Sequence, residues 1–216
     1  MAKKTDLKVR KKRWIQIVSP AFNEQVIGET SVYELNDAVG KSLRINLMNL
    51  TGDPRKQNDR VMFVTDKVKG ETAVLAALTG FTMQAPAMKK LVRRGKTKVA
   101  DSFKCYTADK KPIIVKPFVV TRNLVNNAIQ ARIRWMIRKL TVEKLAKQNF
   151  EDFMKEVVAH SIQKEMQGAV SKIYPLKAFE YYAIKIVPEK GKFYTVDDVK
   201  QDVVETEEPE EDETEK

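Results

Sequence analysis

The chain of 216 residues contains one cysteine, one histidine and only eight glycines, and each scarcity excludes a class of site. A single cysteine, Cys105, rules out an internal disulfide and a cysteine-cluster zinc site, and it fits a reducing compartment. Its position beside Phe103 and Tyr106 in a strand-like pattern favours a small buried hydrophobic residue. Neither GxxxxGK[ST] nor GxGxxG occurs, so the sequence contains no phosphate-cradling glycine loop.

Catalytic constellations are absent as well. A Ser-His-Asp or Cys-His arrangement would have to use His160, which lies inside an amphipathic helical pattern typical of a structural histidine. The acidic residues 207–213 form a structureless run, which favours loose attraction of cations over a metal site with fixed ligands. We therefore expect no catalytic residue, no metal and no cofactor, and predict that the chain is not an enzyme.

Long apolar runs are also missing. No stretch approaches the ~20 apolar residues that cross a bilayer, and the basic start of the chain is not followed by the apolar core of a signal peptide. The sequence therefore predicts a cytoplasmic protein without a membrane partner.

The abundant feature is positive charge. Forty Lys and Arg face 29 Asp and Glu, which gives a net charge of +11. The last twelve residues contain eight acids and one lysine, a local charge of −7, so residues 1–204 carry +18. Such self-repulsion is most simply offset by a polyanion, of which nucleic acid is the commonest.

The first two thirds of the chain favour strands. Apolar alternation predicts strands at residues 14–18, 31–35, 43–50 and 60–68, with a charged surface loop at 51–59. The apolar stretch 73–83 fits a strand or a buried helix, and we interpret it as a strand with a possible bulge at Gly80. A short helix with Pro86 in its first turn and Gly95 as its cap precedes a hairpin formed by residues 98–106 and 112–120.

Helical periodicity dominates the last third. Residues 122–140 form the longest and most basic helical pattern, with an apolar stripe of Val125, Ile129, Ile133, Met136, Ile137 and Leu140. A second helical region follows, in which Asn149 and Asp152 resemble a capping box, and it ends at Pro175. A final strand is expected at residues 178–187.

This order of elements predicts an α+β fold, with a curled, barrel-like and mostly antiparallel sheet packed against helices. We expect a basic arm at residues 1–13, one domain at 14–190 and a C-terminal extension at 191–216. The arm and the acidic tail have little to bury and are expected to be disordered. The tail is either solvated, or it shields the basic surface or contacts a basic neighbour.

Basic residues gather in the arm, after the short helix and along the long helix. Part of each group has a structural explanation. Cations complement the partial negative charge at the C-terminal end of a helix, and Lys and Arg are common on the solvent-exposed face of a helix. Trp14 and Trp135 either stack on unpaired bases or belong to the core. The candidate RNA-binding residues are Lys3, Lys4, Lys8, Arg10, Lys11, Lys12, Arg13, Trp14, Lys89, Lys90, Arg93, Arg94, Lys96, Lys98, Arg122, Arg132, Arg134, Arg138 and Lys139.

Two motifs resemble a known family. Residues 11–30, KKRWIQIVSPAFNEQVIGET, combine a basic run with Trp14, a small residue before Pro20, Phe22-Asn23 and Ile27-Gly28-x-Thr30. Residues 171–176, SKIYPL, match a late family signature with one residue inserted. The order of VTDKVKG, KKLVRR, hairpin and basic helix also agrees. Over roughly residues 8–190 the chain is similar to the small-subunit ribosomal protein family called S-three-a or e-S-one, in its archaeal form.

The resemblance implies a structural constituent of the small ribosomal subunit. It implies binding to ribosomal RNA on the platform, near the messenger exit and the 3′ end of the small-subunit RNA. Expected partners are this RNA, the neighbouring platform proteins and messenger RNA near the exit. A transiently ribosome-associated translation factor is the alternative that composition leaves open, because both need a basic surface.

Overall fold

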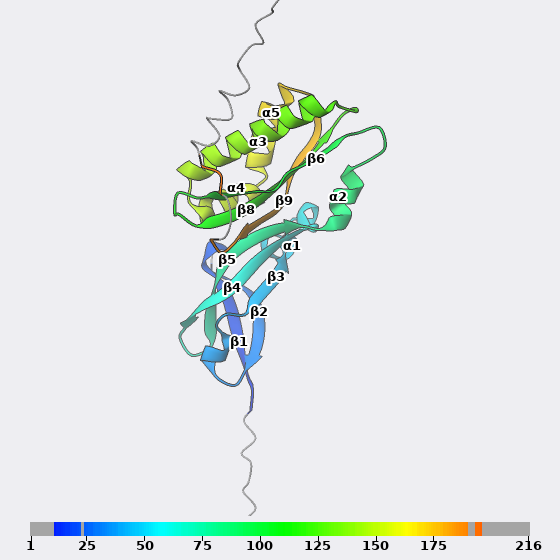
Figure 1. Cartoon of the computed structure of the whole chain (residues 1–216). Helices are drawn as coiled ribbons and strands as arrows, with labels where there is room; N and C mark the ends of the chain where they lie inside the picture. Colours follow the sequence, from blue (N-terminus) through cyan, green and yellow to red (C-terminus); the bar gives the residue numbers. More distant parts are fainter. Residues whose placement is uncertain (1–10, 23, 190–192, 196–216) are drawn as a thin grey trace, which may run out of the picture. The chain divides into compact units, whose positions relative to one another are not determined.

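A computed structural model describes residues 11–22, 24–189 and 193–195 (Figure 1). The chain forms two compact units, one ending at Gly80 and the other beginning at Phe81. Within the described residues, five α-helices accompany a nine-stranded sheet that is not closed. The expected α+β class is confirmed, and the curl does not reach the closure of a barrel. The expected arm up to Arg10 and the acidic tail lie outside the described residues, and the domain division stays a prediction.

The first unit contains the strands β1 (Arg13–Ser19), β2 (Gln25–Val32), β3 (Ser42–Asn46) and β4 (Asp59–Lys69), together with most of β5 (Ala73–Met83), whose last three residues belong to the second unit. β1 pairs with β2 in antiparallel and with β5 in parallel orientation, while β3 and β4 form an antiparallel pair. One core cluster is made of Ile15, Val32, Ala38 and Val74. These four are contributed by β1, β2, a short 3-10 turn and β5, so the turn closes one side of the sheet.

Two sequence predictions in this unit need correction. β2 begins at Gln25 instead of residue 31, and Leu35 lies in the 3-10 turn η2 (Leu35–Ala38). The strand expected over residues 43–50 ends at Asn46, whose side chain accepts a hydrogen bond from Met48 N at 3.1 Å and starts α1 (Leu47–Thr51). This local bond competes with strand pairing.

The remaining short elements lie in turns. η1 (Pro20–Phe22) follows β1 directly, and Pro20, which lacks a backbone N–H, ends the strand. η3 (Pro54–Lys56) lies inside the predicted surface loop, capped by the side chain of Asp53.

In the second unit the helices between residues 127 and 171 lie together against the strands (Figure 1). Its strands are β6 (Lys98–Ala100), β7 (Phe103–Tyr106), β8 (Pro112–Thr121) and β9 (Leu176–Ile186). β8 pairs in antiparallel orientation with β6, β7 and β9. The helices are α2 (Ala85–Leu91), α3 (Asn127–Lys147), α4 (Phe150–Val158) and α5 (Ser161–Ser171), of which α3 contacts β6 and β7 and α5 contacts β9.

Most expected elements of this unit are present with shifted ends. The basic helix begins after the cap residue Asn126 and continues to Lys147, with Ile133 and Ile137 of the predicted stripe buried. α2 has Pro86 in its first turn as expected, but it ends at Leu91, so Gly95 is not its cap. Gly95 instead forms a turn at φ +78°.

The second helical region is two helices instead of one. His160 adopts a left-handed conformation at φ +58° and separates α4 from α5. Its Nδ1 lies 3.6 Å from Glu180 Oε2 on β9. The histidine is therefore a half-buried residue at a helix junction, and the expectation of a position within one helix is wrong.

The core of this unit is rich in aromatic rings. Tyr181 of β9 meets Phe179 edge-on at a centroid distance of 5.4 Å and Phe153 of α4 at 6.2 Å. Cys105 is fully buried on β7, opposite Ile113 of β8. The expectation that this thiol is a small core residue is confirmed.

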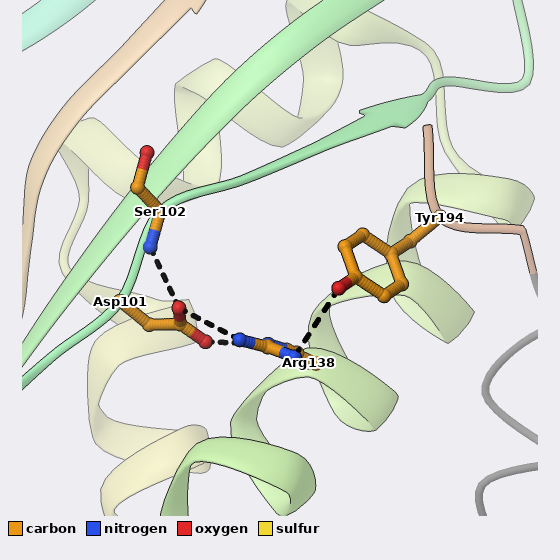
Figure 2. A network of polar contacts seen from close by, with 4 residues as sticks. All are labelled: Asp101, Ser102, Arg138 and Tyr194. Carbon is orange, nitrogen blue, oxygen red and sulfur yellow. Dashed lines mark hydrogen bonds and ion pairs between the residues drawn. The ribbon is translucent and has the colours of Figure 1, made fainter. Parts of the chain in front are cut away.

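The predicted first arm of the hairpin is interrupted at Asp101 and Ser102, and the interruption frees a carboxylate. Arg138 of α3 donates from Nε to Asp101 Oδ2 at 2.5 Å and from Nη2 to Asp101 Oδ1 at 3.0 Å. Ser102 N also donates to Asp101 Oδ1, at 2.8 Å (Figure 2). A bidentate pair of this kind fixes both distance and orientation, so it locks α3 to the break between β6 and β7.

The same guanidinium holds a late segment of the chain. Arg138 Nη1 donates to the Tyr194 hydroxyl at 3.4 Å, and its Cζ lies 5.2 Å from the centre of the tyrosine ring (Figure 2). Tyr194 N donates to Lys104 O at 2.8 Å, and Phe193 stacks on Tyr106 at 4.6 Å. Residues 193–195 are thus fastened to the edge of β7.

The burial of Cys105 generates a first prediction. Burial raises the pKa of its thiol from 9.0 to about 12, so the reactive thiolate is scarce in the native state. We expect the native protein to resist a thiol-specific disulfide reagent at mildly alkaline pH, and the denatured protein to react with one equivalent. Rapid labelling of the native protein would contradict the assigned burial.

The raised pKa also predicts a dependence of stability on pH. The native state keeps the proton that the unfolded state loses, so the contribution of Cys105 is fully present below pH 9.0 and is lost as pH rises towards about 12. Urea unfolding at a series of pH values measures this loss. The variant Cys105→Ala serves as the control, because it lacks the titrating group and should show a smaller decline.

The Asp101–Arg138 pair generates a further prediction. Asp101→Asn keeps the shape but leaves a half-buried guanidinium without its counter-charge, so we expect the free energy of unfolding to fall by about 1–3 kcal/mol. Lys155→Gln is the matched control, because it removes an exposed ion pair to Asp152 at 3.2 Å and should cost less than about 1 kcal/mol. Equal urea midpoints for Asp101→Asn and the unmodified protein would rule out the structural role of the pair.

Candidate nucleic-acid interface

The candidate cations fall into three groups in the structure. Lys3, Lys4, Lys8 and Arg10 lie outside the described residues. Lys11, Lys12, Arg13 and Trp14 are exposed at the start of β1. The stretch after β5 supplies the exposed Lys89, Lys90, Arg93, Arg94 and Lys98 and the half-buried Lys96. Arg122 and Arg132 are exposed, while Arg134, Arg138 and Lys139 are half-buried.

Hydrogen bonds of the backbone and of the Thr121 side chain bring the ends of β6, β8 and β9 to one place. Thr97 N donates to Thr121 Oγ1 at 3.1 Å, and Thr121 N donates to Thr97 O at 3.0 Å. Arg122 N donates to Pro175 O at 3.2 Å, immediately before β9. Residues 96–98, 121–122 and 175–177 are therefore neighbours although they are far apart in sequence.

We call the cations at this edge the strand-end cluster, and it includes one residue that the sequence did not indicate. Lys177, the second residue of β9, donates from Nζ to Leu91 O at 2.8 Å. Partial burial lowers its pKa, and the positive charges of Lys96 and Arg93 lower it further. The members of the strand-end cluster are Arg93, Arg94, Lys96, Lys98, Arg122 and Lys177.

The strand-end cluster consists of like charges. Within the described part of the chain, no ion pair is formed by any of its six members. Lys98 lies over the ring of Phe118 with its Nζ 5.5 Å from the centroid, which orients the side chain but does not neutralise it. An anion placed here gains from every cation and also relieves their mutual repulsion.

Lys89 and Lys90 differ from this cluster. They occupy the last turn of α2, where cations complement the partial negative charge at the C-terminal end of a helix. Both side chains are exposed. They have a structural explanation as expected, and their contact with RNA stays a prediction.

Some cations of α3 make contacts within the protein, and others are exposed to solvent. Arg138 is held by Asp101 and Tyr194, and Lys139 Nζ lies 5.1 Å from the ring centroid of Trp135. Arg132 is exposed near the first turns of the helix. The candidate role of α3 in RNA binding stays a prediction, with Arg132 better placed for it than Arg138.

The two tryptophans have different environments. Trp135 is half-buried on α3 and its Nε1 is buried. Trp14 is 73% exposed on β1. The sequence left open whether each ring packs in the protein or stacks on RNA. Trp135 is packed against the protein, whereas the ring of Trp14 is accessible to a partner.

The described ranges 11–22, 24–189 and 193–195 lack two other kinds of feature. They contain no group of three or more His, Cys, Asp or Glu side chains placed to hold a metal ion. None of the helices found there is long and apolar enough to cross a membrane.

Sequence reasoning missed Lys177 for a physical reason. An isolated lysine in a strand carries no local signal, and its neighbours Arg93 and Lys96 come from a distant part of the chain. Only the register between β8 and β9, in which Thr121 faces Leu176, places it beside them.

Comparison with known proteins identifies the family. A model of the ribosomal S3Ae family matches residues 1–190. The small ribosomal subunit protein eS1 of Nanoarchaeum equitans is 31% identical over 167 residues, which cover 77% of this chain and 84% of that protein. The eS1 proteins of Saccharolobus solfataricus and Methanobrevibacter smithii are 28% and 27% identical, covering 84% and 82% of this chain and 88% and 92% of theirs. The motif at residues 11–30, the basic helix and the late SKIYPL segment all lie within the matched region, and the chain belongs to the ribosomal S3Ae family.

Proposed function

We propose that this chain is a structural component of the small ribosomal subunit that binds ribosomal RNA and neighbouring ribosomal proteins without catalysing a reaction. Membership of the S3Ae family supports the ribosomal role, since the relatives are named as small-subunit proteins. The finer location, on the platform near the messenger exit and the 3′ end of the small-subunit RNA, is the one that the family resemblance implies. Messenger RNA near the exit is a further proposed partner.

The strand-end cluster is the observation that carries the RNA-binding part of the proposal. Its six cations come from three separate stretches, and the charges of Lys96 and Arg93 already lower the pKa of Lys177. A phosphate backbone meets such a surface with a regular row of negative charges, and each phosphate that binds a cation releases condensed counterions. Folded RNA hides its bases in a deep and narrow major groove, so contacts to phosphates and 2′-hydroxyls are the expected mode.

Arginine and lysine are expected to contact the phosphates in different ways. Arg93, Arg94 and Arg122 present planar guanidinium groups that form two parallel hydrogen bonds to one phosphate. Lys96, Lys98 and Lys177 act as point charges. Binding therefore depends on RNA shape and phosphate spacing more than on base sequence.

Sedimentation of a cell lysate tests the ribosomal assignment. A structural component should travel with the small subunit in a sucrose gradient at unit stoichiometry, at moderate and at high salt, when followed by immunoblotting. A transient translation factor would instead be washed off at modest salt or remain at the top of the gradient. That outcome would give first place to the transient-factor alternative.

Charge reversal tests the strand-end cluster. Changing Arg93, Arg94, Lys96 and Lys98 together to Glu should abolish incorporation into the small subunit, because attraction to phosphate becomes repulsion at four positions. For the isolated protein, the dependence of RNA affinity on salt should weaken, with the slope falling by about one for each phosphate that no longer binds a cation.

A matched control distinguishes the effect of the position of the reversed charges from the effect of the change in net charge. The exposed residues Lys67, Lys110, Lys155 and Lys164 lie elsewhere on the two units, and changing them to Glu alters the net charge by the same amount. The control protein should still incorporate. Normal incorporation of the first variant, or equal loss in both, would remove the role assigned to the strand-end cluster.

A further inference from the structure

The outer face of the β1–β2 pair carries two exposed aromatic rings. Trp14 is 73% exposed and Tyr33, directly after β2, is 48% exposed. In the antiparallel register Trp14 faces Ser31 and Arg13 faces Val32, so continuing the register places Lys12 opposite Tyr33. Trp14 and Tyr33 are therefore diagonal neighbours on one face, close enough for large side chains to act together.

This face is distinct from the one that packs. Ile15 and Val32 point to the other side of the pair, where they are 3% and 4% exposed and belong to the core cluster. A strand that alternates in this way does not need a tryptophan on its solvent side for stability. A single exposed apolar residue needs no explanation, but two aromatic rings beside a run of cations form a surface with a defined chemistry.

The cations are adjacent to the rings. Lys12 Nζ lies 5.3 Å from the ring centroid of Tyr33, a cation–π contact that holds both side chains in place. Lys11 and Arg13, its neighbours in the chain, are exposed, and the register places Arg13 opposite Val32, on the other face of the pair. Among the described residues neither Trp14 nor Tyr33 contacts another aromatic ring. Lys12 covers one face of Tyr33, and the 73% exposed Trp14 is the more accessible of the two rings.

We propose that Trp14 and Tyr33 form a stacking platform for unpaired bases of single-stranded RNA, with Lys12, on the same face, contacting the adjoining phosphate. This inference rests on the proposed RNA-binding function and specifies one surface of it. Stacking uses the flat face that every base has, so the platform accepts single strands with little dependence on sequence. It differs from the strand-end cluster, whose chemistry suits phosphates alone.

An apolar protein surface is the other class of partner for exposed rings. The charge of the site argues against it, because Lys12 lies against Tyr33 and its chain neighbours Lys11 and Arg13 are also exposed cations. The rest of the face is small and polar, with Ser31 opposite Trp14 and Glu29 opposite Gln16. Glu29 marks the end at which phosphates would be repelled.

Fluorescence of the full-length protein tests the platform, because the chain has only two tryptophans. Trp135→Phe leaves Trp14 as the sole tryptophan, and Trp14→Phe leaves Trp135. Single-stranded oligouridine should strongly quench the emission of the Trp135→Phe protein and leave that of the Trp14→Phe protein nearly unchanged. Duplex RNA of equal length and inorganic polyphosphate supply the phosphates without unpaired bases, and should quench neither.

Affinity supplies a second readout. Trp14→Ala should weaken binding of oligouridine by about 5- to 100-fold, the loss of one stacked base, whereas Trp14→Phe should restore most of it. Binding of duplex RNA should be the same in both variants. Trp14 is a surface residue, so both variants should keep the urea midpoint of the unmodified protein.

Several outcomes would overturn the platform. Quenching of Trp14 by polyphosphate as strong as that by oligouridine would reduce the site to electrostatic attraction. Unchanged oligouridine affinity in Trp14→Ala would exclude stacking, and if the same variant also left the small subunit, a protein partner would take its place. Failure of the platform leaves sedimentation of the unmodified chain with the small subunit intact, so the two proposals fail separately.

Discussion

Arg138 joins three parts of the second unit, and the placement of the basic helix depends on it. Its guanidinium binds Asp101 at the break between β6 and β7, and it contacts Tyr194 of the late segment 193–195. The side chains of Arg138 and Asp101 are 29% and 11% exposed, so their desolvation costs free energy that the bidentate geometry offsets. The pair is better explained by orientation than by net stability, because it fixes the rotation of α3 about its axis.

That orientation determines which cations reach solvent. Ile133 and Ile137 face the core, Arg138 is engaged at the sheet, and Arg132 is left exposed. At the other end of the strands, the chain accepts repulsion among Arg93, Lys96 and Lys177 without carboxylates to relieve it. Arg138 is neutralised within the fold, whereas the described ion pairs include none of the cluster's cations, and this contrast supports the proposal that the cluster binds an external anion.

Periodicity predicted the regular elements and failed where one residue redirects the backbone. β4, β5 and β9 lie within two residues of their expected ends, because hydrophobic alternation is a local property. Asn46, Asp101 and His160 broke the pattern through a helix cap, an ion pair and a left-handed turn, none of which apolar spacing encodes. The RNA-binding role of the candidate residues stays a prediction. Clusters of charge are visible in sequence, but the pairing that engages Arg138 and the register that adds Lys177 and Tyr33 depend on distant residues.

The two surfaces would respond differently to salt, and this difference gives each a separate role. Attraction to phosphates at the strand-end cluster falls steeply as salt rises, since its driving force is the release of counterions. Stacking on Trp14 and Tyr33 depends on contact between flat rings, which salt hardly screens. A basic surface alone holds any RNA and a stacking surface alone holds any single strand. The two proposals together predict preferential binding to RNA that offers both a structured phosphate backbone and unpaired bases.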